Sequence, residues 1–183
     1  GQANANDINA NLKYPTLDAR IRDTYAEKST AARKAQLYDS YIRAFRWATD
    51  RIGDKGVVAF VSNGGWIESN ASDGVRLSFV EDFNEVHVFN LRGNQRTAGE
   101  QSRKEGGKVF GSGSRNTVAI TIGVKDPQAS GCRIFYRDIG DYLSAKEKLA
   151  IVDHATTALT EDAEAHRRGK IPPNKYGDRI SLC

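Results

Sequence analysis

The residues KAQLYDSYIRAFRWATDRIGDKGVVAFV (34–61) change from a helical pattern to a strand pattern, and this change indicates the fold class. Over 34–52 apolar side chains recur every three or four positions, which predicts an amphipathic helix. These positions are Leu37, Tyr38, Tyr41, Ile42, Phe45, Ala48 and Ile52. Gly53 follows, as glycine does where a helix ends. The unbroken apolar run 57–61 predicts a strand buried on both faces, and a helix followed by such a strand is typical of an α/β fold.

Further along the chain, apolar runs predict strands at 85–91, 117–124 and 132–138. Helical spacing over 69–83 predicts a helix before the first of these strands. Residues 92–116 are polar and glycine-rich and show no helical period, so the strand at 117–124 is expected to return as an antiparallel hairpin partner. The sequence thus predicts an α/β fold whose sheet is mostly parallel and ends in an antiparallel hairpin.

Both ends of the chain are polar. Residues 1–33 predict a long loop with one short helix near 17–28, ahead of an α/β domain over 34–140. Ser144 and Glu147 match a capping box that opens a helix lasting to about His154. The final region, 141–183, is therefore expected to hold this helix and then a polar tail or linker.

Composition excludes several classes of protein. Hydrophobic residues make up 39% and charged residues 27% of the chain, which is typical of a packed globular domain. Cys132 and Cys183 form no disulfide framework and the three histidines suggest no metal site, so a reducing, cytoplasmic setting is expected. No apolar run approaches the ~20 residues that span a bilayer, so no membrane contact is expected. The net charge of +4 is compatible with a polyanionic partner.

The basic character is concentrated in the glycine-rich stretch 92–116. Six basic residues lie there against Glu100 and Glu105. The six are Arg92, Arg96, Arg103, Lys104, Lys108 and Arg115. Lysine, arginine and backbone amide groups contact the phosphates of DNA, so these six are candidate DNA-backbone contacts. An ordinary solvated loop is the alternative that composition leaves open.

Two further features lie near strand ends. KVFGSGS (108–114) places Phe110 among glycines, where an exposed aromatic ring can stack on an unpaired base. The alternative for Phe110 is a core residue that anchors the loop. The turn SNGGWI (62–67) follows the strand at 57–61, where open α/β sheets bind ligands. The alternative for this turn is a tight bend with Trp66 packed in the core.

Established catalytic motifs are missing from the sequence. It contains no GxxxxGK[ST] phosphate loop, no GxGxxG after a strand, no GxSxG elbow and no HExxH. We therefore assign no catalytic residue and no metal ligand.

The runs 37–96 and 106–127 together resemble adenine-specific DNA methyltransferases of the gamma-like motif order. The likeness covers about residues 11–140 and is strongest to the single-chain restriction–modification proteins of type ISP, also labelled DEAD/DEAH-helicase-like. The resemblance implies a partial Rossmann-like methyltransferase sheet with an antiparallel final hairpin. It also implies S-adenosylmethionine as the cofactor of the parent enzyme and methyl transfer to the amine of a flipped adenine.

Single residues follow from the same resemblance. LYDSYI (37–42) is similar to the helix before the family's fifth strand, so Leu37 and Tyr38 are expected to border the cofactor pocket. KVFGSGSRNTVAI (108–120) is similar to the base-binding motif, in which an aromatic residue at the position of Phe110 stacks on the flipped adenine. The basic residues around Phe110 would then bind phosphates.

The departures from the family are equally informative. Its cofactor-binding glycine motif and NPPY-type catalytic tetrad are absent, and by resemblance the tetrad would lie directly before Gly1. The chain is therefore expected to be the C-terminal half of such a domain, inactive alone and without tight binding of S-adenosylmethionine. Its expected partners are double-stranded DNA and the remainder of the parent polypeptide. Two alternatives stay open: a non-catalytic DNA-binding module, and a remnant that forms a homo-oligomer through an unpaired sheet edge.

Overall fold

The computed structural model describes residues 13–110 and 115–154. The expectations for 1–12, for the GSGS part of the 108–114 motif and for the tail from residue 155 lie outside these ranges.

The described part of residues 1–33 is largely helical. Helix α1 (Pro15–Ile21) continues into a π-helical turn, η2 (Arg22–Ala26). Ile21 and Tyr25 are fully buried in the main core. The short helix expected near 17–28 is confirmed and begins slightly earlier, at Pro15. Residues 29–34 form neither helix nor strand.

The amphipathic helix is confirmed but begins later than expected. Residues 35–38 form a 3-10 turn, η3 (Ala35–Tyr38), and helix α2 spans Ser40–Arg51. Asp39 lies between them with extended backbone angles, φ −62° and ψ 147°, and separates the two. Gly53 has φ 63°, the left-handed conformation that glycine adopts where a helix ends.

The remaining elements follow the expected order. They are β1 (Gly56–Asn63), the 3-10 turns η4 (Gly64–Trp66) and η5 (Asn70–Ser72), α3 (Asp73–Asp82), β2 (Glu85–Arg92), α4 (Gly99–Glu105), β3 (Val118–Lys125) and β4 (Arg133–Asp138). Residues 145–154 are helical. The expected capping box is present, because the Ser144 amide donates to Glu147 Oε2 at 2.8 Å and the Glu147 amide donates to Ser144 Oγ at 3.3 Å.

Helix α4 corrects the expectation that residues 92–116 contain no helix. No residue of α4 is buried. A helix without a buried face has no apolar period, so the usual sequence signal for a helix is missing here.

The four strands form one sheet in the order β1-β3-β2-β4. β3 runs antiparallel to β1 and β2, whereas β4 runs parallel to β2. Strands β1, β2 and β4 therefore point the same way, and β3 runs against them. The antiparallel pairing of β2 with β3 and the mixed α/β sheet, consistent with a partial Rossmann-like fold, are both confirmed.

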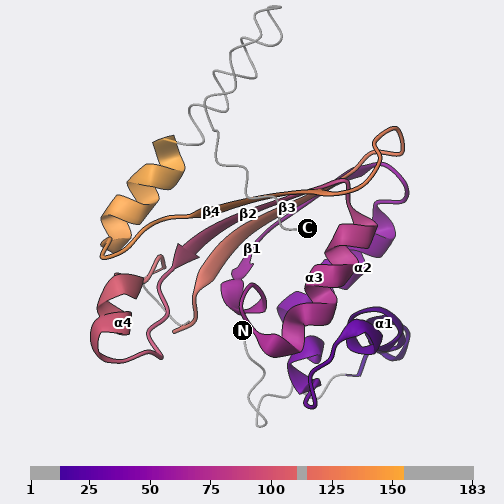
Figure 1. Cartoon of the computed structure of the whole chain (residues 1–183), viewed down its shortest axis with the longest axis horizontal. Coiled ribbons are helices and arrows are strands. Elements are labelled where there is room, and N and C mark those ends of the chain that lie inside the picture. Colours follow the sequence, from indigo (N-terminus) through magenta and orange to yellow (C-terminus); the bar gives the residue numbers. More distant parts are fainter. Residues whose placement is uncertain (1–12, 111–114, 155–183) are drawn as a thin grey trace, which may run out of the picture.

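The main core lies between one face of the sheet and helices α1, α2 and α3 (Figure 1). Aromatic rings fill its centre: the ring of Phe79 lies edge-on to those of Phe45 and Trp66, with centroids 5.4 and 5.2 Å apart. Edge-on aromatic pairs contribute about 0.5–1.5 kcal/mol each beyond the area they bury. A second, smaller core forms around Leu91, Val109 and Ile139, against which helix 145–154 packs Ile151 and Val152.

Strand β1 is not buried on both faces, which corrects the expectation for 57–61. The side chains of Val57 and Val61 are 60% and 58% exposed. β1 lies at an edge of the sheet, and Val58 faces the main core while its neighbours face the other side. An unbroken apolar run predicts two covered faces only where a second layer packs on the sheet. The second core contains no residue of β1, so the second face of this strand stays uncovered.

Candidate nucleic-acid interface

The carboxyl ends of β1 and β2 meet at one edge of the sheet. Asn63 and Arg92, near the ends of β1 and β2, are both in register with Val118 at the start of β3. β4 ends at the same edge, because Asp138 is in register with Asn90 of β2. The basic stretch 92–116 leaves and re-enters the sheet here. Open α/β sheets bind their ligands at this edge.

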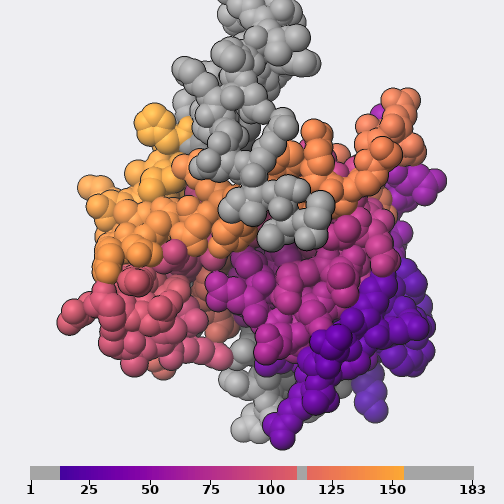
Figure 2. All heavy atoms as spheres, in the orientation of Figure 1, coloured from indigo at the N-terminus to yellow at the C-terminus, as the bar shows by residue number. Residues whose placement is uncertain are grey.

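The basic stretch is held against the segment that follows β4. Figure 2 shows the segment around α4 in contact with the segment that leads from β4 to residue 154. The amide of Gly107 donates to the carbonyl oxygen of Leu143 at 2.9 Å, and the amide of Tyr142 donates to the carbonyl oxygen of Lys104 at 3.1 Å. These backbone bonds give the stretch a defined position beside the sheet edge.

Phe110 is exposed at this surface. Its side chain is 54% exposed, while the adjacent Val109 is 5% exposed and packs in the second core. Val109 therefore anchors the stretch, and the alternative in which Phe110 is the core residue is wrong. The stacking of Phe110 on a base stays a prediction.

The basic side chains differ in how far they reach solvent. Arg96, Arg103 and Arg115 are exposed, whereas Lys104 and Lys108 are partly exposed. Arg103 lies 3.5 Å from Glu100, and Arg115 donates to the carbonyl oxygen of Gln95 at 3.0 Å. An exposed ion pair contributes little stability, so it leaves Arg103 available to a polyanion. Their contact with DNA stays a prediction.

Arg92 is engaged within the fold. Its Nε lies 2.8 Å from Asp138 Oδ1, and its Nη1 also binds Asp141. Its backbone is in the left-handed region, with φ 55°, which is uncommon for a residue other than glycine. Two carboxylates neutralise its charge, so Arg92 fixes the end of β2 to the end of β4 and is the least suited of the six basic residues to bind phosphate.

A buried polar network that the sequence analysis missed supports this edge. Asn90 is 7% exposed, accepts the Arg92 amide at 3.0 Å and donates to the Tyr136 hydroxyl at 3.1 Å. Burial raises the pKa of Tyr136, so its hydroxyl stays protonated at neutral pH. A signal was available in the sequence, because Asn90 continues the inward alternation of Val86 and Val88.

The turn after β1 packs tightly. Trp66 is 4% exposed in the main core, and the Asn63 side chain accepts the Gly65 amide at 2.9 Å. A Cβ on Gly64 would lie 3.2 Å from the Cβ of Ala119, so the turn lies close against β3. The tight bend with a core tryptophan is confirmed, and binding of a ligand by this turn stays a prediction.

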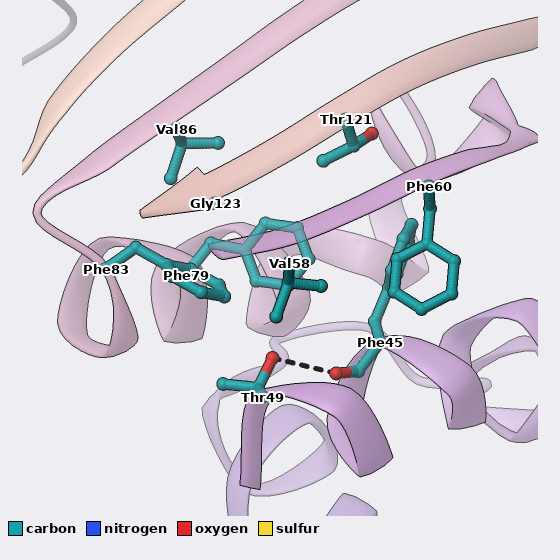
Figure 3. Close-up of a pocket in the computed structure, with 9 residues that line it drawn as sticks. All are labelled: Phe45, Thr49, Val58, Phe60, Phe79, Phe83, Val86, Thr121 and Gly123. Atoms are coloured by element: carbon teal, nitrogen blue, oxygen red, sulfur yellow. Dashed lines mark hydrogen bonds between the residues drawn. The ribbon is translucent and has the colours of Figure 1, made fainter. Parts of the chain in front are cut away.

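The residues expected to border a cofactor lie in or against the main core. Leu37 is fully buried, and Tyr38 is partly exposed. Neither lines the small cavity that lies in the core between α2, α3 and the sheet (Figure 3). The residues that line it are Phe45, Thr49, Val58, Phe60, Phe79, Phe83, Val86, Thr121 and Gly123. Since none of them is charged, this cavity does not suit the charged amino-acid portion of S-adenosylmethionine, and it is a packing feature of the core.

In residues 13–110 and 115–154, no group of His, Cys, Asp and Glu side chains is arranged to hold a metal ion. No helix in the same ranges combines the length and the apolar character needed to cross a membrane.

Three solved structures of complexes with DNA or a DNA substrate mimic are similar to this chain. A nuclease-deletion mutant of the Type ISP restriction-modification enzyme LlaGI, in complex with a DNA substrate mimic, is 47% identical with a TM-score of 0.79, over 84% of this chain and 15% of that one. DrdV in a DNA complex is 42% identical with a TM-score of 0.74, over 81% and 14%. The ATP-dependent Type ISP restriction-modification enzyme LlaBIII bound to DNA is 41% identical with a TM-score of 0.72, over 76% and 9%.

The chain thus spans only a small part of the length of each of these proteins. Within that part the fold is shared, because identity above 40% accompanies TM-scores above 0.7. No protein-family model and no curated protein matches the chain.

Proposed function

We propose that this chain is the DNA-facing half of an adenine-specific methyltransferase domain in a single-chain restriction–modification polypeptide of type ISP. The observation that carries the proposal is the exposed Phe110 within a basic stretch at the carboxyl edge of the sheet. Support also comes from the similar structures: two are complexes with DNA, one is a complex with a DNA substrate mimic, and two are named as Type ISP enzymes.

The basic side chains would bind the DNA backbone. We assign this role to Arg96, Arg103, Lys104, Lys108 and Arg115, which are exposed or partly exposed. Each cation that neutralises a phosphate releases condensed counterions, so the affinity should fall steeply as salt rises. Double-stranded DNA is therefore the proposed partner.

Phe110 would receive the target base. An adenine amine is inaccessible to chemistry inside the duplex, so the base must leave the stack. A ring that is 54% exposed beside phosphate-binding cations offers a stacking surface for the extruded base. Phe110 would then offset part of the free energy that unstacking costs.

The remainder of the parent polypeptide would supply the chemistry. S-adenosylmethionine would provide the methyl group, and the residues that hold it would lie mainly outside this chain. Leu37 lies within the core and Tyr38 is only partly exposed. We propose that both pack behind the wall of the S-adenosylmethionine pocket and do not touch the cofactor directly. We assign no proton transfer or methyl transfer to the described residues.

A second candidate is a module that oligomerises instead of binding DNA. It is favoured by the outer edge of β1, which pairs with no strand among residues 13–110 and 115–154 and where Val57 and Val61 are largely exposed. Sheet edges with exposed apolar side chains promote strand pairing between chains.

DNA binding tests the main proposal. The chain is titrated into a short duplex that carries 2-aminopurine opposite an abasic site, so that the fluorescent base is easily extruded. In the wild type, stacking on Phe110 should quench the fluorescence of 2-aminopurine. We expect Phe110→Ala to weaken binding by about 5–150-fold, the equivalent of ~1–3 kcal/mol of stacking, and to relieve this quenching. Trp47→Ala is the matched control, because Trp47 is 51% exposed on α2, away from this edge.

Equal affinity and equal quenching for the wild type and Phe110→Ala would exclude the stacking role. A companion assay offers the chain radiolabelled S-adenosylmethionine and duplex DNA. No transfer by the chain alone is expected, and clear transfer would overturn the assignment of the chemistry to the rest of the parent polypeptide.

A further inference from the structure

Lys148 is a fully buried lysine, with 0% of its surface exposed. It belongs to helix 145–154, and its Nζ donates to the carbonyl oxygens of Glu105 at 2.7 Å and Gly107 at 2.9 Å. Lysines are almost never fully buried unless a partner compensates for the lost hydration. Burial lowers the pKa of Lys148, as expected for an ammonium group removed from water. Lys148 is not among the residues proposed to touch DNA.

The bonds from Lys148 lie at the carboxyl end of α4. Because α4 has no buried residue, core packing does not hold it, and a helix of seven residues is too short to be stable alone. Its last carbonyl groups are instead satisfied by neighbours: Lys104 O accepts from the Tyr142 amide, and Glu105 O accepts from Lys148 Nζ. A cation at this end also interacts favourably with the helix dipole.

Two glycines let the chain after α4 approach the Lys148 helix closely. Gly106 has φ 66°, and a Cβ there would lie 2.1 Å from the carbonyl oxygen of Leu143. A Cβ on Gly107 would lie 2.6 Å from the amide nitrogen of Ala145. The segment 105–107 is therefore pressed onto the start of the helix, and Phe110 emerges three residues later.

We propose that Lys148 is a positioning residue for the DNA interface. Its buried ammonium group fixes the end of α4 and the segment 105–107, and it thereby sets where Lys104, Lys108 and Phe110 meet DNA. Lys148 itself is enclosed, so it acts through these residues and does not touch the nucleic acid. This inference rests on the proposed function.

The experiment compares Lys148→Met with Lys146→Met. Methionine keeps much of the length and the apolar stem of lysine but cannot donate to the two carbonyl groups. Lys146 lies on the same helix and is exposed, so its variant loses the same charge without touching α4. Thermal unfolding and far-UV circular dichroism establish that both variants are folded.

Hydrogen exchange tests, without DNA, whether the bonds from Lys148 to the carbonyl groups of Glu105 and Gly107 hold this segment in place. We expect Lys148→Met to speed amide exchange about tenfold or more at Gly107 and Tyr142, while exchange in α2 and α3 stays as in the wild type. With the 2-aminopurine duplex, Lys148→Met should weaken binding about fivefold or more and relieve the quenching of 2-aminopurine. Lys146→Met should change the affinity by only about twofold and leave the quenching as in the wild type. Wild-type affinity and quenching in Lys148→Met would overturn the inference.

The two proposals fail in different ways. A wild-type chain that does not bind the duplex overturns the proposed function and, with it, the positioning role of Lys148. Amide exchange at Gly107 still decides, in that case, whether Lys148 holds the segment 105–107 in place. If Lys148→Met does not fold, Lys148→Gln provides the second variant, because its amide can still donate to a carbonyl group. Partial protection of the Gly107 and Tyr142 amides together with partial quenching of 2-aminopurine in Lys148→Gln supports the inference. Loss of this protection with full quenching of 2-aminopurine contradicts it.

Discussion

Gly74, in the first turn of α3, packs its Cα directly against the carbonyl oxygen of Tyr25. A Cβ at Gly74 would lie 1.8 Å from that oxygen and 2.9 Å from the amide nitrogen of Ser29. The N-terminal helical segment and α3 are therefore in backbone contact. Atoms of the backbone cannot rotate away as the end of a side chain can, so this crossing tolerates no side chain.

Gly74→Ala should destabilise the chain strongly. Forcing a methyl group into packed backbone typically costs about 1–3 kcal/mol, and we expect a value at or above the top of this range because the opposing atoms belong to the main chain. Urea unfolding monitored by tryptophan fluorescence measures the change. Leu77→Ala on the same helix is the control, because Leu77 is 51% exposed. Wild-type stability in Gly74→Ala would show that α3 and η2 do not cross as described.

Asp73 gives the chain an acid-sensitive contact beside the same crossing. Its Oδ2 accepts from the Thr30 amide at 2.8 Å and from Thr30 Oγ1 at 2.7 Å, and its Oδ1 accepts from the Gly74 amide at 2.7 Å. Burial by itself would raise the pKa of Asp73, but hydrogen bonds from Ser29, Thr30 and Gly74 outweigh it and hold the pKa well below its usual range. The ionised carboxylate therefore stabilises the folded state.

Asp73→Asn should lower the free energy of unfolding by about 1.5–3 kcal/mol near neutral pH, since hydrogen bonds to a charged group are lost. Because the folded pKa is depressed, this contribution is fully present above the unfolded pKa of about 4 and is lost as pH falls below it. The difference between wild type and variant should thus be constant at higher pH and shrink below about pH 4. Asp54→Asn, in the exposed turn after α2, controls for the loss of one carboxylate. A difference independent of pH would refute the assignment.

Arg92 and Arg103 should respond in opposite ways. Arg92→Ala removes the links to Asp138 and Asp141 and should cost about 1–3 kcal/mol of stability without changing the salt dependence of DNA binding. The Arg103 side chain is 78% exposed, so Arg103→Ala should leave stability within about 0.5 kcal/mol of wild type. It should instead reduce the slope of log affinity against log salt by about 1. Anisotropy titrations at several salt concentrations, paired with urea unfolding, measure both effects. A lower salt slope for Arg92→Ala would return Arg92 to the DNA-binding set.

The edge of β1 should make the isolated chain self-associate. Val61 is 58% exposed on a strand that, in the described part of the chain, is paired on one side only. A lysine at such a position opposes edge-to-edge pairing. We expect Val61→Lys to shift sedimentation toward the monomer at concentrations where the wild type forms larger species. Leu77→Lys, on the exposed side of α3, should have no such effect. A wild type that stays monomeric throughout would remove the second candidate function.

The strands and the larger helices were predictable because their signals are local. The spacing of apolar residues in α2 and the runs in β2 and β3 report which face of each element is covered, and neighbouring residues share that face. The antiparallel pairing of β2 with β3 was predicted because the sequence of 92–116 shows no helical period. α4 was not predicted, because a helix that buries no residue shows no apolar period in the sequence.

The candidate site was only partly predictable. The concentration of positive charge in 92–116 and the aromatic residue among glycines are properties of composition, and they are visible without a fold. That Arg92 turns inward to Asp138 is not, because the two lie 46 residues apart and meet only when β4 pairs with β2. The burial of Lys148 depends likewise on the contact of its helix with α4.

The amino-acid order alone therefore determined the strands, the larger helices and the place where charge gathers, since these depend on neighbours within a few residues. Only the tertiary structure decided that Val109 enters the core while Phe110 faces solvent, and that β1 lies at an open edge with Val57 and Val61 uncovered. The physical reason is that burial is a property of two surfaces. A residue's own chemistry sets the free energy gained on burial, but a distant part of the chain must be present to cover it.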